Sequence, residues 1–135
     1  MPVYTSYFGN IKKMNSILSD FVFFSVAGKT PEWFEKKNTK RFKKLGFLAP
    51  KYEWWKEWHD RFSDNLESVE SKKFYTERYD STVLSKLDID RLREIFEDCD
   101  GIPVLLCYET PEKFCHRHLI SDFLNKHNIK CEEWN

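Results

Sequence analysis

Four short runs of apolar, β-branched and aromatic residues stand out along the chain. They cover residues 3–8, 21–27, 102–108 and 129–132. Each run has about the length of a buried strand, and each is almost continuously apolar. The pattern therefore predicts four strands, two near each end of the chain.

Helical spacing of the apolar positions follows between these runs. Ile11, Met14, Ile17 and Leu18 fall on one face of a predicted helix, and Asn10 is its expected N-cap. Residues 51–98 are predicted to be mostly helical, with a capping aspartate before a helix over residues 89–98. The cap and the expected core anchors of this stretch are Asp88, Leu84, Leu87, Leu92, Ile95 and Phe96.

The same helix-opening signal occurs twice. Residues 30–32 and residues 110–112 both read Thr-Pro-Glu, and each follows a predicted strand. A capping hydroxyl, a proline at the first helical position and an acid in the first turn all favour a helix start. We therefore predict that one helix begins at Pro31 and another at Pro111.

Strands that alternate with helices indicate the fold class. Buried strands of this kind are typical of a parallel or mostly parallel sheet that helices cover on both faces. We predict an α/β fold, a single compact three-layer domain over residues 1–135 with a short, mostly parallel sheet. Ligands bind such sheets at the carboxyl ends of the strands, so residues 6–10, 25–30 and 107–112 should converge there.

The overall charge is zero, but it is unevenly distributed. Residues 1–56 carry eleven Lys or Arg against four Asp or Glu, and the remaining residues carry eleven against eighteen. This balance argues against a general nucleic-acid coat protein. The chain also lacks an apolar run of membrane-spanning length, and its first residues lack the blocks of a secretion signal. We expect a cytoplasmic protein with no membrane partner.

The four cysteines, at positions 99, 107, 115 and 131, include no Cys-x-x-Cys pair. Neither a disulfide framework nor a zinc ribbon is indicated, and reduced thiols are expected. The aromatic content is 17%, with five tryptophans. So many rings suggest that some of them bind a ligand.

The end of the third predicted strand carries the most chemically capable residues. Side chains alternate along a strand, so Cys107 and Glu109 should point the same way. A short turn then leads to Cys115, His116 and Arg117 at the start of a helix. Its buried stripe is predicted to be Leu119, Ile120, Phe123 and Leu124, with Arg117 turned off that stripe toward the loops.

These residues suggest an active site. A thiol near a helix N-terminus beside an imidazole has its thiolate favoured, which makes Cys115 the candidate nucleophile. His116 would carry protons, Glu109 would act as base or orienter, and Arg117 would clamp an anion. The dipole argument requires a break in the helix near Phe114, because a start at Pro111 would place Cys115 in the second turn.

Other interpretations of the same residues stay open. Arg117 would pair with Glu109 if it bound no anion, and both cysteines would be core thiols if the site were only structural. Cys107, Cys115 and His116 are also ligands that zinc accepts, although their spacing matches no standard zinc site. We predict neither a metal nor a cofactor.

The strand Val104–Glu109 and the segment Phe114–Ile120 together closely resemble the signature of the domain of unknown function 488 family. The resemblance extends more weakly over most of the chain, to Ser25, Tyr75 and Tyr79 among others. It implies a compact α/β fold and makes Cys107, Glu109, Cys115, His116 and Arg117 family motif positions. It implies no established activity.

Some branches of that family carry an Asp-Val-Arg motif after the second strand, where this chain reads Ser-Val-Ala-Gly-Lys over residues 25–29. We therefore predict no role here that needs that acid and that arginine. The predicted ligand-binding residues, for a nucleotide or another phosphate-containing ligand, are Arg117, Cys107, Ser25, Lys29, Tyr75 and Tyr79.

A second segment suggests a competing function. Six positive charges lie within residues 36–44, and aromatic residues surround them. Positive charge interleaved with flat rings is typical of single-stranded nucleic-acid binding, although a solvated helix face beside core tryptophans gives the same string. In a non-catalytic binding module over residues 33–58, for nucleic acid or a protein partner, the candidate contacts are Lys40, Arg41, Lys43, Lys44, Trp54 and Trp55.

Overall fold

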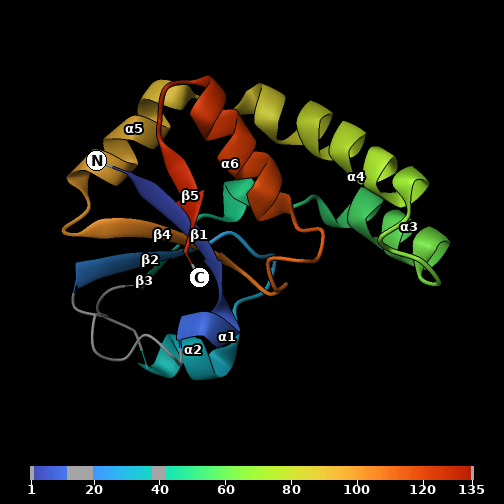
Figure 1. Cartoon of the computed structure of the whole chain (residues 1–135), viewed down its shortest axis with the longest axis horizontal. Coiled ribbons are helices and arrows are strands. Elements are labelled where there is room, and N and C mark those ends of the chain that lie inside the picture. Colours follow the sequence, from blue (N-terminus) through green and yellow to red (C-terminus); the bar gives the residue numbers. More distant parts are fainter. Residues whose placement is uncertain (1, 12–19, 38–41, 135) are drawn as a thin grey trace.

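A computed structural model describes residues 2–11, 20–37 and 42–134 (Figure 1). Strands and helices alternate along the described chain, except that residues 52–98 contain three α-helices in succession. The strands are β1 (Val3–Tyr7), β2 (Phe21–Ser25), β3 (Phe42–Lys44), β4 (Ile102–Cys107) and β5 (Cys131–Glu133). The helices are α1 (Phe8–Ile11), α2 (Glu32–Lys37), α3 (Tyr52–Phe62), α4 (Val69–Thr82), α5 (Ile89–Asp98) and α6 (His116–Lys126), with short 3₁₀ turns at Gly46–Leu48 and Leu84–Lys86.

The five strands form one sheet in the order β3-β2-β4-β1-β5, and every pairing is parallel. The strand β4 lies between β1 and β2, so its carboxyl end is at the middle of the sheet. This confirms the predicted α/β fold with a parallel sheet. It also places Cys107, the last residue of β4, between the ends of two neighbouring strands.

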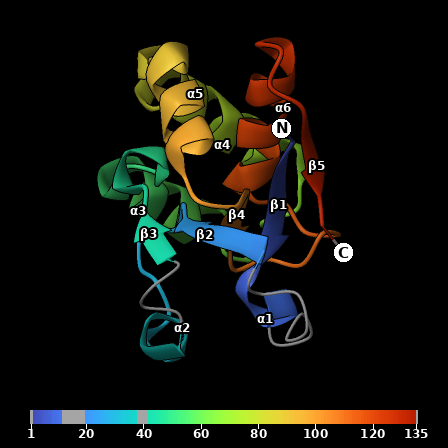
Figure 2. The same cartoon turned by 90° about the vertical axis from the view of Figure 1, so that its left-hand side faces the viewer.

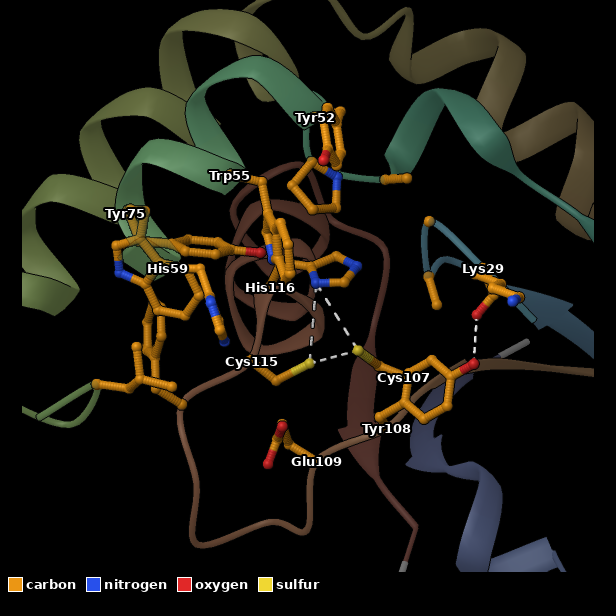
Figure 3. A pocket seen from close by; sticks show the side chains of 17 residues that line it. Lys29, Tyr52, Trp55, His59, Tyr75, Cys107, Tyr108, Glu109, Cys115 and His116 are labelled. Atoms are coloured by element: carbon orange, nitrogen blue, oxygen red, sulfur yellow. Dashed lines mark hydrogen bonds between the residues drawn. The ribbon is translucent and has the colours of Figure 1, made fainter. Parts of the chain in front are cut away.

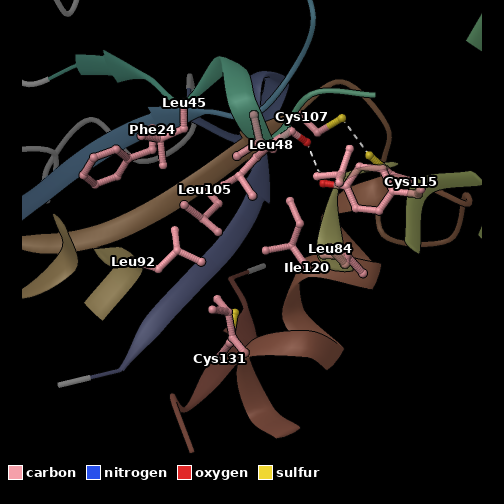
Figure 4. Packing of buried hydrophobic residues seen from close by; sticks show 14 of the residues in the cluster. Phe24, Leu45, Leu48, Leu84, Leu92, Leu105, Cys107, Cys115, Ile120 and Cys131 are labelled. Atoms are coloured by element: carbon pink, nitrogen blue, oxygen red, sulfur yellow. Dashed lines mark hydrogen bonds between the residues drawn. The ribbon is translucent and has the colours of Figure 1, made fainter. Parts of the chain in front are cut away.

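Alternation along the strands produces two hydrophobic layers. In β2, Phe21 and Phe23 pack on one face with residues of α1 and α2, whereas Val22 and Phe24 pack on the other with residues of α3 to α6. A period of two is what a sheet buried on both faces requires. Figure 2 shows α1 and α2 on one side of the sheet and α4, α5 and α6 on the other, and Figure 4 shows the larger layer from close by.

The helix α6, after which the chain returns to the edge of the sheet, is terminated by a residue in the left-handed conformation. Asn128, with a φ of 64°, follows the last turn of α6, and the Ile129 N–H donates to the Leu124 carbonyl over 2.9 Å. Asparagine tolerates this left-handed conformation, which commonly terminates a helix. The reversal allows β5 to run alongside β1.

Several predicted elements differ from the structure. Residues 42–44, predicted within a solvated basic segment, form the edge strand β3, and the second Thr-Pro-Glu signal opens no helix. The chain turns there instead, with the Lys113 N–H donating to the Thr110 carbonyl, and α6 begins only at His116. The first signal does lead into α2, but the Thr30 hydroxyl donates to Ser25 Oγ. Most of the predicted helix with Met14 lies outside the described residues.

None of the helices in the described part of the chain has the length and apolar character that crossing a membrane requires.

Candidate functional site

A pocket of about 680 Å³ opens at the carboxyl edge of the sheet, between the ends of β2 and β4 and the helices α3 and α4 (Figure 3). Loops from three parts of the sequence supply its floor, and aromatic side chains of α3 and α4 supply much of its wall. The convergence of strand ends matches the position expected for a ligand site in a parallel sheet. Its principal side chains are Lys29, Tyr52, Trp55, His59, Tyr75, Cys107, Tyr108, Glu109, Cys115 and His116.

Two thiols meet at the bottom of this pocket. Cys107 ends β4, and Cys115 is the N-cap of α6, with an extended backbone at φ −151° and ψ 147°. Their Sγ atoms lie 2.6 Å apart, and each residue is only 5% exposed. The break before α6 puts Cys115 at the positive end of the helix dipole, which is the condition that the nucleophile prediction required.

The turn that carries Cys115 is held from the outside. Both carboxylate oxygens of Glu67 accept from the Phe114 N–H over 3.1 Å, and the Phe114 ring packs edge-on against Tyr75. These contacts join the turn to α4 and to the segment before it. They explain why residues 110–114 do not continue into a helix despite the favourable local signal.

His116 contacts both sulfur atoms. Its Nε2 lies 2.6 Å from the Val26 carbonyl oxygen, which can only accept, so this nitrogen carries a proton. Nδ1 is then unprotonated in the neutral ring, and it lies 3.7 Å from Cys107 Sγ and 3.8 Å from Cys115 Sγ. The ring is therefore oriented to take a proton from either thiol, as Figure 3 shows.

The surroundings shift the pKa values of the two thiols in opposite directions. Burial raises the pKa of Cys115, but hydrogen bonds from Cys107 and His116, the charge of His116 and the Arg117 N–H together hold that pKa well below its usual value. The contact with Cys115, together with burial, raises the pKa of Cys107 well above its usual value. These opposite directions favour the proton on Cys107 and the negative charge on Cys115.

Tyr75 and Tyr79, both on α4, stand over this pair and are buried. The Tyr75 ring packs edge-on against Trp54 and Trp58, and the Tyr79 hydroxyl donates to the Leu48 carbonyl over 2.5 Å. Burial, followed by the nearby negative charge of the cysteines, raises the pKa of both tyrosines well above the usual value. Tyr75 lines the pocket, whereas Tyr79 supports the His116 ring at 5.6 Å between centroids.

The predicted outward orientation of Arg117 is wrong, because its side chain is fully buried. Its Nε and Nη2 donate to the two carboxylate oxygens of Glu133 over 3.1 and 2.9 Å, and Nη1 donates to the Glu109 carbonyl oxygen over 2.6 Å. The suggested partner was the Glu109 carboxylate, yet that side chain is exposed at the pocket. Arg117 therefore joins α6 to β5 and to the exit of β4.

The two residues predicted at the end of β2 have different environments. Ser25 is buried and accepts a hydrogen bond from Thr30, so it lies inside the protein. Lys29 is exposed and lines the pocket, and its carbonyl oxygen accepts a hydrogen bond from the Tyr108 hydroxyl. Of this pair, Lys29 is the one placed to contact a ligand.

The basic and aromatic segment is divided between different parts of the molecule. Lys43 and Lys44 are exposed on the edge strand β3, and Lys44 pairs with Glu35 over 2.5 Å. Trp54 is buried and donates to Thr82, whereas Trp55 lines the pocket. Lys40 and Arg41 lie outside the described residues, and nucleic-acid binding by this segment stays a prediction.

The sequence analysis named Trp55 only as a nucleic-acid contact and did not assign one face of α3 to the cysteine site. Tyr52, Trp55 and His59 all line the pocket, with the Trp55 and His59 rings stacked at 5.1 Å and 17°. Their spacing of three and then four residues places them on one side of a helix, which is the signal that would have grouped them. Glu133, the partner of Arg117, was also missed, and no local pattern connects those two residues.

The ligand atoms of Cys107, Cys115 and His116 all lie within 4.8 Å of one another, and within the described residues they form the cluster best suited to a soft metal. However, two thiolates on one tetrahedral zinc lie about 3.8 Å apart, given the usual zinc–sulfur distance. The 2.6 Å between the sulfur atoms is much shorter. The spacing of the two sulfur atoms therefore does not fit a zinc centre that both of them bind.

Comparison with known proteins supports the resemblance in the sequence. A family model described as the Active DUF488-N3 subclade matches residues 26–128, which are most of the chain and include both cysteines of the pocket. No curated protein and no solved structure matches the chain. The chain belongs to the domain of unknown function 488 family, in its DUF488-N3a subclade.

Proposed function

We propose that this chain is an enzyme that uses the Cys115 thiolate as a nucleophile on a nucleotide-type substrate bound in the aromatic pocket. The observation that carries the proposal is the placement of Cys115 at the N-terminus of α6, against His116 and at the bottom of a pocket. A thiolate activated by an imidazole and a helix terminus is the usual arrangement for covalent catalysis by cysteine.

The neighbouring groups support this chemistry. His116 accepts the thiol proton at Nδ1 and returns it to a leaving group, while its Nε2–H bond to the Val26 carbonyl keeps the ring in place. Glu109 stands exposed at the same pocket and orients polar groups of the substrate. The description of the matched family model as active agrees with a catalytic role.

The pocket lining supports the proposed class of substrate. Rings on α3 and α4 offer flat surfaces for a heteroaromatic base, and Lys29, which lines the same pocket, supplies a positive charge for an anionic group such as phosphate. A volume of about 680 Å³ lies in the range of pockets that hold a nucleotide-sized ligand. A nucleoside monophosphate meets all three conditions.

The nucleophile is tested by iodoacetamide labelling over a pH series, followed by peptide mapping. Cys115 is expected to react fastest, with a midpoint well below the usual thiol pKa of about 8.5. Cys131 is the internal control, because burial raises its pKa to about 11 and it should remain unlabelled in the folded chain. His116→Gln should move the Cys115 midpoint upward, since the imidazole no longer stabilises the thiolate.

An ordinary midpoint for Cys115, or no labelling while the chain is folded, would remove the nucleophile from the proposal. The substrate class is tested separately. A panel of nucleoside monophosphates should protect Cys115 from labelling, and Trp55→Ala should reduce this protection by about tenfold, as expected for the loss of one stacked base. Protection that is equal for inorganic phosphate would contradict recognition of the base.

A further inference from the structure

A second thiol within contact distance of the first is not needed by an enzyme with one cysteine nucleophile. Cys107 lines the same pocket as Cys115, its sulfur lies 2.6 Å from the Cys115 sulfur, and neither thiol is engaged in a disulfide. Cys131, also buried, does not line the pocket, and Figure 4 shows it apart from Cys107 and Cys115. The short distance between the Cys107 and Cys115 sulfur atoms therefore points to a function that uses both of them.

The imidazole points to the same conclusion. His116 Nδ1 is almost equidistant from the two thiols, at 3.7 and 3.8 Å, while its Nε2 proton is held by the Val26 carbonyl. A base that served one nucleophile would be expected to face that sulfur alone. This ring can deprotonate either thiol without turning, which is what two successive sulfur attacks require.

We propose that Cys107 and Cys115 form a dithiol site that reduces low-molecular-weight disulfides, with Cys115 as the attacking and Cys107 as the resolving cysteine. The proposal rests on the nucleophile of the proposed function and adds an activity, a substrate class and a role for Cys107. It needs no other oxidant, since the disulfide substrate is itself the electron acceptor.

The first step transfers one half of the substrate. The Cys115 thiolate attacks a sulfur of R–S–S–R, so a bond forms between Cys115 Sγ and that sulfur, and the original S–S bond breaks. The leaving group departs as RS⁻ and takes from His116 Nδ1 the proton that Cys115 gave up when its thiolate formed. The products are RSH and a neutral imidazole with Nδ1 free.

The second step closes the pair. Nδ1 of His116 takes the proton of Cys107, whose sulfur attacks Cys115 Sγ, and the second RS⁻ leaves and receives that proton. In total the two protein thiols lose two protons and two electrons, and one disulfide substrate becomes two thiols. The two sulfur atoms already lie in contact, so the second attack is intramolecular and needs no rearrangement that brings distant residues together.

The test uses hydroxyethyl disulfide, a small uncharged probe, with the full chain and a metal chelator present. Intact-protein mass and peptide mapping follow the products. The unmodified chain is expected to lose two hydrogen atoms and to yield a peptide that links Cys107 to Cys115. Cys107→Ser should instead retain a mixed disulfide on Cys115 with a lifetime at least about a hundredfold longer, because intramolecular attack carries a very high effective molarity.

Two controls make the result specific. Cys131→Ser should behave as the unmodified chain does, and Cys115→Ser should form no adduct. Circular dichroism checks that each variant is folded, and Cys107→Ala replaces Cys107→Ser if the hydroxyl is not accepted in the core.

The outcomes separate this inference from the proposed function. If the adduct on Cys115 persists as long in the unmodified chain as in the Cys107 variants, Cys107 resolves nothing and only the inference fails. The same holds if Cys115 is alkylated by iodoacetamide at neutral pH but never reacts with the disulfide. If neither reagent modifies Cys115 in the folded chain, both proposals fail.

Discussion

At the scale of single residues, the chemical type of a side chain does not by itself determine the role of that side chain in the fold. Arg117 has the chemistry of an anion clamp, yet it is fully buried and its three hydrogen bonds go to Glu133 and to the Glu109 carbonyl. It follows Cys115 by only two positions, so its anchoring fixes the start of α6. Arg117 is thus a positioning residue for the thiolate.

This role predicts a loss of stability when its partner is neutralised. Glu133→Gln should lower the free energy of unfolding by about 2–3 kcal/mol, because a buried guanidinium loses its ionic partner. Glu132→Gln, one position earlier on β5, is the matched control. Its exposed carboxylate pairs with Lys130 over 3.4 Å and should contribute less than about 0.5 kcal/mol. Urea unfolding of both variants measures the difference, and equal effects would contradict the anchoring role.

At the scale of elements, helix-start signals succeeded where nothing competed with them. The predicted cap Asp88 accepts from the Asp90 and Arg91 N–H groups at the start of α5, over 3.1 and 3.2 Å. The Thr-Pro-Glu signal at residues 110–112 had equal local support but failed. There, the Glu67 carboxylate accepts a hydrogen bond from the Phe114 N–H, and the Phe114 ring packs against Tyr75. These contacts favour a turn.

The Asp88 N-cap of α5 should contribute measurably to the free energy of unfolding. Asp88→Ala should reduce the free energy of unfolding by about 1 kcal/mol, since two N–H groups of the first turn lose their acceptor. Asp88→Asn should retain most of that stability, because the amide oxygen accepts the same bonds. Thermal and urea unfolding at neutral pH compare the two variants, and a harmless alanine would show that water replaces the cap without cost.

At the scale of the whole molecule, the pocket is assembled from segments distant in sequence. The loop after β2 provides Lys29, the end of β4 provides Cys107 and the start of α6 provides Cys115. The helices α3 and α4 cover them with Trp55 and Tyr75. The packing of α3 and α4 over the cysteines buries Tyr75 and Tyr79 near the two thiols. The site and the packing of the larger hydrophobic layer are therefore energetically linked.

This linkage predicts a loss of stability in alkali. Tyr75 and Tyr79 have a pKa well above the usual value in the folded chain, so they remain protonated when the unfolded chain releases its protons. Their contribution is fully present below the unfolded pKa of about 10 and falls as the pH rises above it, by up to about 1.4 kcal/mol per pH unit and group. Burial raises the pKa of Cys131 to about 11, so this residue also makes the free energy of unfolding fall as the pH rises.

The lowered pKa of Cys115 acts in the opposite sense, but its contribution is already complete above its unfolded pKa. Urea unfolding between about pH 9 and about pH 11 tests the prediction. Tyr79→Phe is the comparison, since it removes one titrating group and should flatten the decline. A free energy of unfolding that stays constant over this range would contradict it.

Local pattern alone determined a large part of this protein. Four of the five strands, the α/β class, the Asp88 cap and the meeting of Cys107, Cys115 and His116 at a strand end could all be predicted. These features depend on the period of apolar positions and on residues near one another in sequence, which are properties that a single chain displays directly.

Only the tertiary structure decided the rest. The edge strand β3 is three residues long and exists because β2 pairs with it, and Arg117 is buried because Glu133 returns beside it on β5. The α3 face with Trp55 and His59 gained its role when the helix packed over the carboxyl edge. Each of these depends on contacts between residues far apart in the chain, and their energies outweigh local preferences that differ by only about 1 kcal/mol.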